Sequence, residues 1–117
     1  MSEPTVNWPE KSGLYVVVQL ELDGEPYLRF PTNEEESFHP VILGIFLDRH
    51  GIRHATPPAL EVGRYRVPGM GLANVDAEQR SASFFGNSIT YRIGIDRKHL
   101  ERIRELQREW VIDLDSR

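Results

Sequence analysis

The chain contains no cysteine and no hydrophobic run long enough to cross a bilayer. The missing cysteines exclude a disulfide framework, a thiolate nucleophile and cysteine metal ligands. The longest apolar runs are LYVVV and VILGIFL, far shorter than the ~20 residues of a membrane-spanning helix. The N-terminal segment also lacks the basic and apolar regions of a secretory signal. We therefore expect a cytoplasmic protein that does not interact with a membrane.

Lysine is scarce, because twelve of the fourteen basic residues are arginines. The net charge of −4 argues against a protein that coats nucleic acid, but the charge is unevenly distributed. Residues 1–48 hold nine acidic and two basic side chains (−7), and residues 49–117 hold nine acidic and twelve basic ones (+3). This polarity is able to orient a partner or a second copy of the chain.

The length of 117 residues fits one domain of ordinary size. Hydrophobic residues make up 39% and charged residues 27% of the chain, which is typical of a globular protein. Residues 1–12 contain two prolines and no periodicity, so we interpret them as an irregular arm with Trp8 against the body. Residues 13–117 are expected to form the single globular domain.

Alternation of apolar and polar residues predicts the first strand. From Leu14 to Leu22 the even positions are all apolar and the odd ones are mixed, which is typical of a strand with one face on the core. Asp23 and Gly24 tolerate the positive φ of a tight hairpin turn. Residues 27–30 are therefore predicted to form the return strand.

The segment 41–47 is apolar at both parities. This pattern predicts a central strand that is buried on both faces, or buried on one and covered by an interface on the other. Asp48 to Gly51 would form a hairpin turn, with residues 52–55 returning beside the strand. Because a short sheet has open ends that one helix is too small to cover, this strand is the expected self-association surface. Its residues in that role are Val41, Leu43, Ile45 and Leu47.

The second half of the chain predicts two further strands and a helix. Residues 60–68 and 88–95 alternate, whereas the segment 68–87 is glycine-rich at both ends and is expected to be a long loop. In the last strand Ile89 is expected to face inward. Asp96 is expected to cap a helix over residues 97–110, whose apolar residues share one stripe.

Together these elements predict an α+β fold. We expect about five short antiparallel strands in meander order, strongly bent or closed into a small open barrel of SH3-like or Sm-like shape. One C-terminal amphipathic helix would cover a face or an opening. Glycines inside strand patterns mark sharp curvature, and here they are Gly44, Gly63 and Gly94.

Three of the four histidines flank the segment 41–47. If this segment is a strand, His39 lies ~20 Å from the turn and cannot share a metal with His50. Asp48, His50 and His54 remain as a weak hypothesis of a metal-assisted hydrolase. A polar hairpin tip is the favoured interpretation, because these residues lack a recognisable metal-binding spacing.

An arginine-rich strand face is the basis of a second hypothesis. Arg64, Arg66 and Arg92 are expected to project from strands, with Phe84 and Phe85 in the neighbouring loop. Arginines beside exposed rings bind single-stranded nucleic acid through phosphate contacts and base stacking. A charged outer face of the sheet is favoured over this alternative, because the intervening tyrosines do not share the parity of the arginines.

The favoured function is a non-enzymatic interaction module that self-associates through its sheet, with a homodimer as the expected state. No serine lies in a pattern that activates a hydroxyl, and the GMG segment lacks the third glycine of a dinucleotide site. We therefore predict no catalytic residue and no cofactor.

Overall fold

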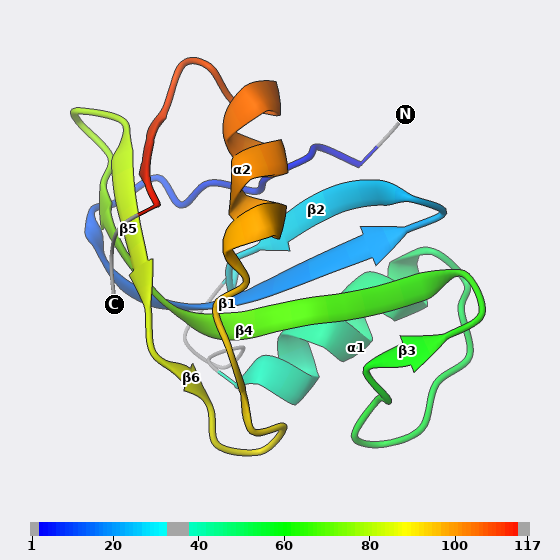
Figure 1. The fold of residues 1–117 in the computed structure, drawn as a ribbon. Helices are drawn as coiled ribbons and strands as arrows, with labels where there is room; N and C mark the ends of the chain where they lie inside the picture. The colour runs from blue at the N-terminus through cyan, green and yellow to red at the C-terminus, as the bar shows by residue number, and fades with distance from the viewer. Residues whose placement is uncertain (1–2, 33–37, 115–117) are drawn as a thin grey trace.

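A computed structural model describes residues 3–32 and 38–114 as an α+β fold, in which a strongly curled half-barrel sheet carries one helix on each face (Figure 1). The elements along the chain are β1 (Gly13–Leu22), β2 (Glu25–Arg29), α1 (His39–Arg49), β3 (Glu61–Val62), β4 (Tyr65–Asp76), β5 (Ser81–Phe85), β6 (Asn87–Ser88), β7 (Ile93–Gly94), α2 (Arg97–Leu106) and β8 (Val111–Asp113). The expectation of an α+β fold with a strongly bent sheet is confirmed.

The sheet is mixed rather than entirely antiparallel. Its strand order is β2-β1-β4-β5-β8, with β3 pairing onto β4, and β6 and β7 form a separate pair. All pairs in the main sheet are antiparallel except β5 with β8. The helix α2 lies between β5 and β8 in the chain and supplies the crossover that a parallel pair requires. The sequence analysis did not predict β8 as a strand.

The predicted central strand 41–47 is wrong, because these residues lie in α1. An apolar run of this length has no period that separates a buried strand from a buried helix. Pro40 stands in the first turn of α1, where its missing N–H is not needed. Leu43 and Leu47 are four residues apart and fully buried, whereas Ile45 is half-buried and Val41 is exposed. Half of the expected self-association surface is therefore core.

The expected hairpin after residue 47 is also wrong. Asp48 belongs to the last turn of α1, and His50 is the C-terminal cap. Gly51 does adopt positive φ (+66°), but it ends a helix rather than a hairpin. Residues 52–55 form no strand. By contrast, the hairpin at Asp23 and Gly24 is confirmed, with φ of +52° and +84°.

The expected loop 68–87 contains most of β4 and all of β5. Small residues at Gly69 and Gly71 hide the alternation of β4, and they are required by close packing. A Cβ on Gly71 would lie 2.5 Å from the carbonyl oxygen of Phe85. The strand expected over 88–95 is instead the short pair β6 and β7 joined by a turn, and Ile89 in that turn is exposed rather than inward.

A β-bulge interrupts the pairing of the two longest strands. Gln19 of β1 pairs with Gly69 of β4, but Glu21 pairs with Arg66, so β4 has one extra residue between these points. Pro68 lies in the bulge, where a residue without an N–H is tolerated. The glycines expected to mark the curvature lie elsewhere, in α1 (Gly44), in the β3–β4 turn (Gly63) and in β7 (Gly94).

A buried polar network lies beside the bulge and holds α2 on the sheet. The Gln19 side-chain amide donates to the carbonyl of Asp96 (2.8 Å) and accepts from the Asp96 N–H (2.8 Å). The same amide donates to Nδ1 of His99 (3.1 Å), so the Nε2–H of His99 donates to the carbonyl of Leu20 (3.0 Å). The Asp96 carboxylate accepts from the His99 N–H (2.9 Å), which confirms the predicted helix cap.

Each face of the sheet has its own hydrophobic core. On one face α2 packs Leu100 and Ile103 against side chains of β1, β4, β5 and β8. On the other face α1 packs against the β1 and β4 residues Val18, Leu20 and Met70. Figure 1 shows α1 under the end of the sheet near β3, away from β5. No helix in the described part of the chain is long and apolar enough to span a membrane.

The burial and hydrogen bonds of His39, His54 and His99 predict how these three side chains titrate. Burial lowers the pKa of His99 despite its hydrogen bond to Leu20, and burial also lowers the pKa of His39, which contacts the Gly71 carbonyl (2.9 Å). The pKa of His54 is raised by its hydrogen bonds to the Ala55 carbonyl and to Asp48. NMR titration of the ring protons should therefore give pKa values below 6.5 for His39 and His99 and above 6.5 for His54.

The free energy of unfolding should depend on pH through the two buried histidines, His39 and His99. A group whose folded pKa is depressed binds its proton more readily in the unfolded chain. The stabilisation from His99 and His39 is thus present above pH ~6.5 and is lost as the pH falls toward their folded pKa values. Urea unfolding at pH 7.5 and 5.5 measures this loss, and it should be smaller in His99→Gln. An equal loss in that variant would contradict the role of His99.

Candidate binding surfaces

The N-terminal arm, defined as Glu3–Trp8, runs along the outer edge of β2. The N–H of Leu28 donates to the carbonyl of Thr5 (2.9 Å), and Val6 forms a parallel bridge with Leu28. The Asn7 side chain donates to the carbonyl of Phe30 (2.9 Å) and accepts from its N–H (2.7 Å). The arm therefore continues the sheet as an added strand would, partly through a side-chain amide.

Trp8 holds the end of the arm against the segment that follows α2. Its ring stacks on Trp110 with a centroid distance of 3.7 Å and an interplanar angle of 4°. Its Nε1–H donates to the side chain of Gln107 (2.9 Å). The expectation that Trp8 packs on the body thus agrees with the structure, and its partner Trp110 lies in the segment between α2 and β8.

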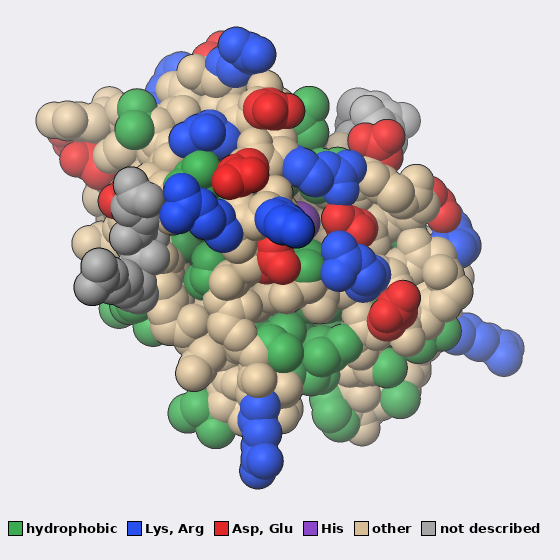
Figure 2. Space-filling view, in the orientation of Figure 1, with side chains coloured by type: hydrophobic (Ala, Val, Ile, Leu, Met, Phe, Trp, Pro, Cys, Tyr) green, Lys and Arg blue, Asp and Glu red, His purple; other side chains and the backbone are tan. Residues whose placement is uncertain are grey.

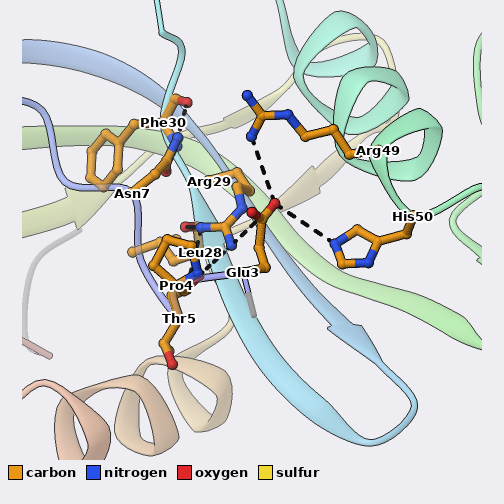
Figure 3. Close-up of polar contacts among 9 residues, drawn as sticks. All are labelled: Glu3, Pro4, Thr5, Asn7, Leu28, Arg29, Phe30, Arg49 and His50. Carbon is orange, nitrogen blue, oxygen red and sulfur yellow. Dashed lines mark hydrogen bonds and ion pairs between the residues drawn. The ribbon is translucent and has the colours of Figure 1, made fainter. Parts of the chain in front are cut away.

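Arg29 is the buried side chain that holds the arm, as Figure 3 shows. It is only 3% exposed, and its guanidinium donates to the carbonyls of Leu28 (2.8 Å) and Pro4. The guanidinium lies 5.3 Å from the ring centre of Tyr27 and 5.1 Å from that of Phe46. Arg29 thus binds the arm backbone while resting on two aromatic rings.

A basic cluster, defined as Arg29, Arg49 and His50, surrounds the carboxylate of Glu3. The Glu3 Oε1 atom lies 3.8 Å from a nitrogen of Arg29 and 3.7 Å from nitrogens of both Arg49 and His50 (Figure 3). These distances exceed those of hydrogen bonds, and Oε1 and the Arg29 Nε are both buried without a hydrogen-bond partner. The Glu3 carboxylate therefore offsets the positive charge of Arg29 by electrostatic attraction, without a hydrogen bond from its Oε1 atom.

Burial changes the acidity of the central arginine. Desolvation lowers the pKa of Arg29 to about 10, and the Glu3 carboxylate opposes this shift. Arg29 therefore stays charged at neutral pH. The negative charge of Glu3, in the arm, partly compensates this buried positive charge.

An open half-face is the second candidate surface. It lies on the α1 side of the sheet, beyond the end that α1 covers, and strand pairing places its residues in rows. Leu14 and Val111 are its most exposed apolar residues, at 62% and 67%. The remaining members, identified by register, are Val16, Leu72, Asn74, Asp76, Ser81, Ser83, Phe85 and Asp113.

The open half-face is hollowed and differs from the surface over α2. An open hollow of ≈ 780 Å³ lies over it, lined by Asn74, Ser83 and Val111 among others. Figure 2 shows acidic and basic side chains interspersed over α2, with hydrophobic side chains gathered below it. Interspersed charges of this kind are typical of a solvated surface. The open half-face instead combines aliphatic and aromatic side chains with hydroxyl and amide groups and the carboxylates of Asp76 and Asp113.

The residues of the nucleic-acid hypothesis do not converge on one face. Arg64 donates twice to Asp23 (2.9 and 3.1 Å), and Arg66 pairs with Glu21 (3.1 Å). Arg92 lies in the turn between β6 and β7 with φ of +58°. The two phenylalanines point to opposite faces of β5. Phe84 is fully buried and unable to stack on a base, whereas Phe85 is half-buried on the open half-face.

The proposed metal ligands are divided between two places. His54 Nε2 lies 2.8 Å from the Asp48 carboxylate, whereas His50 faces Glu3. In residues 3–32 and 38–114 no three histidine, aspartate or glutamate side chains are grouped to hold a metal ion. Because 41–47 is helical, the strand spacing expected for His39 does not apply, but a rise of ~1.5 Å per residue along α1 still places His39 ~16 Å from His50. His39 is buried at the start of α1 instead.

Comparison with known protein families and with curated proteins gives no match to this chain.

Sequence analysis missed the residues that hold the arm. Arg29 stands in a predicted strand, and no pattern distinguishes a buried arginine from an exposed one there. The arm itself offered one signal, because an aromatic residue such as Trp8 is uncommon in an unstructured solvated segment. The pairing of Glu3 with Arg29 spans two elements and has no local signature.

The role of Arg29 predicts the effect of Arg29→Met. Methionine fills the space of the stem but cannot donate to the carbonyls of the arm. The variant should lose about 2 kcal/mol of unfolding free energy and shift its tryptophan fluorescence as Trp8 leaves Trp110. Arg49→Met is the control, because Arg49 is largely exposed and should cost under ~0.5 kcal/mol. Unfolding and emission like those of the unsubstituted protein in Arg29→Met would refute the role.

Proposed function

We propose that the protein is a non-enzymatic interaction module that forms a homodimer through the open half-face and the adjoining edge of β8. The observation that carries this proposal is the exposure of Leu14 and Val111 on a face that is core elsewhere. Leu14 on β1 and Val111 on β8 have β4 and β5 between them, so they mark two margins of this face rather than one patch. A sheet face with exposed apolar residues at both margins is a candidate contact surface. Their neighbours are hydroxyl and amide side chains together with the carboxylates of Asp76 and Asp113, so the proposed contact surface is partly polar and partly acidic.

The edge of β8 supports a second copy as the occupant. The Val111 N–H donates inward to the carbonyl of Arg80 (2.8 Å). Because alternate residues of a strand point their N–H groups to opposite edges, the Ile112 N–H faces outward. No further strand of the described chain pairs there. Two β8 strands that meet antiparallel about a two-fold axis satisfy both edges and place the two open half-faces side by side on the same side of one continuous sheet.

This geometry revises the route of self-association expected from the sequence. Leu43 and Leu47 are buried in the core and cannot contact a second copy. The outer edge of β8, at the end of the sheet, has no partner strand among the described residues. The other end is already covered by the arm along β2. The proposal therefore moves the interface from residues 41–47 to β8 and the strands beside it.

Val111→Asp tests the proposed dimer. The substitution places a charge on the open half-face at an exposed position, so it should weaken association by about tenfold or more, or ~1.4 kcal/mol. Size-exclusion chromatography with light scattering over micromolar concentrations measures the change. Val62→Asp is the matched control, since Val62 is an exposed strand valine on β3 and should leave the dimer unchanged. A monomeric unsubstituted protein at all these concentrations would refute the proposal.

A further inference from the structure

The basic cluster surrounds a carboxylate without forming hydrogen bonds to its buried oxygen. Arg29 comes from β2, whereas Arg49 and His50 stand at the C-terminal end of α1. Each of these side chains has a nitrogen 3.7 or 3.8 Å from the Glu3 Oε1 atom (Figure 3). Charge-assisted hydrogen bonds between such groups are about 2.7–2.9 Å long. The site therefore attracts an anion that the Glu3 side chain fits poorly.

One edge of the buried Arg29 guanidinium is only partly bonded. Its Nη2 atom donates to the carbonyl of Pro4 and lies nearest Glu3, whereas its Nε atom is buried without a partner. Arg64 shows how the same edge binds a carboxylate that fits, because its Nε and Nη2 atoms donate to the two oxygens of Asp23 at 3.1 and 2.9 Å. Arg29 thus retains a buried donor that Glu3 does not use.

A phosphate group matches the basic cluster better than a carboxylate does. A carboxylate has two oxygens in one plane, but the three basic side chains approach from two different elements. A phosphate monoester has three free oxygens in a pyramidal arrangement, which provides a separate acceptor for each side chain. Its charge of about −1.5 to −2 at neutral pH suits two arginines, and the planar guanidinium fork is well matched to phosphate oxygens.

The space at the cluster determines how such a group enters. A cavity of ≈ 20 Å³, lined by Arg29 and Arg49 among others, adjoins the cluster. This volume is about that of one water, so a phosphate group takes the place of the Glu3 carboxylate rather than binding beside it. The side chain of Arg49 is 57% exposed, so the site is open to solvent on this side.

Glu3 is able to leave the cluster while the rest of the arm stays bound. Residues 4–8 are held by their own contacts with β2 and with the segment after α2, and none of these contacts involves the Glu3 side chain. The Arg29 guanidinium also donates to the carbonyl of Leu28 (2.8 Å), which keeps it oriented. Displacement therefore requires movement of one side chain and leaves the donors in place.

We propose that the basic cluster is a binding site for a phosphate group, and that Glu3 occupies it as an internal competitor until the phosphate displaces it. Inorganic phosphate and phosphate monoesters share the required chemistry. This site does not depend on the proposed dimer, because it adjoins β2 at the opposite end of the sheet from β8. Competition by Glu3 weakens the apparent affinity by the fraction of molecules in which the cluster is free.

NMR titration of the full chain with inorganic phosphate tests the site. Phosphate replaces chloride at constant ionic strength and neutral pH, so that general screening does not change. The ring protons of His50 and the backbone amide of Arg49 should shift and reach saturation. Acetate tests the requirement for a pyramidal anion and should give no saturable shift. A parallel titration with O-phosphoserine distinguishes a monoester from the free anion as the preferred source.

Two variants in the site have matched controls. Glu3→Gln removes the competing charge and should tighten phosphate binding by about tenfold, if Glu3 leaves the cluster free in roughly a tenth of the molecules. Glu10→Gln removes an exposed charge outside the cluster and should not change the Kd. Arg49→Met removes a charged donor and should weaken binding by about tenfold or more. Arg53→Met makes the same change at an exposed arginine outside the cluster and should preserve binding.

The outcomes decide the proposal. Saturable shifts that tighten in Glu3→Gln and weaken in Arg49→Met, but not in the two controls, support it. Equal weakening in Arg49→Met and Arg53→Met overturns it, because phosphate then responds to net charge alone. An unchanged Kd in a folded Glu3→Gln overturns the role of Glu3 as competitor. If that variant does not fold, the unsubstituted protein still decides, since the absence of saturable shifts at His50 and Arg49 overturns the site.

Discussion

The structure depends on the side-chain amide of Gln19, which is buried where the longest strands lose their register. Its two hydrogen bonds to the backbone of Asp96 fix the first turn of α2, and its bond to His99 fixes the tautomer of that ring. A buried amide left without these partners costs about 1–3 kcal/mol for each unsatisfied group. The network therefore holds one particular placement of α2 on the curled sheet.

The unequal coverage of the sheet follows from this placement and from the small size of α1. With α2 fixed on one face, α1 is the helix that covers the other, and its 11 residues reach only the end near β3. The far end keeps Leu14 and Val111 exposed beside β8. At the opposite edge, the arm and Arg29 cover β2. One end of the sheet is thus closed by the chain itself and the other is left for a partner.

Sequence patterns predicted the elements whose signal is local. The alternation of β1, the turn at Asp23 and Gly24, and the cap at Asp96 each depend on neighbouring residues, and each is present. The prediction of a strand over residues 41–47 was wrong because a fully buried helix and a fully buried strand are both apolar throughout. Most of β4 was predicted to be a loop because Gly69 and Gly71, which interrupt its alternation, are required by close contacts with residues distant in the sequence. The arm and the open half-face are arrangements between elements, which no short pattern contains.

The most direct test of a second copy on β8 is amide hydrogen exchange of the unmodified protein at low and high concentration. The Ile112 N–H points to the outer edge and should exchange more slowly at high concentration, when the edges pair. The neighbouring Val111 N–H is bonded to Arg80 within the chain and serves as the internal reference. Slower exchange confined to Ile112 and the open half-face is the predicted result. Exchange at Ile112 that does not change with concentration would contradict the account.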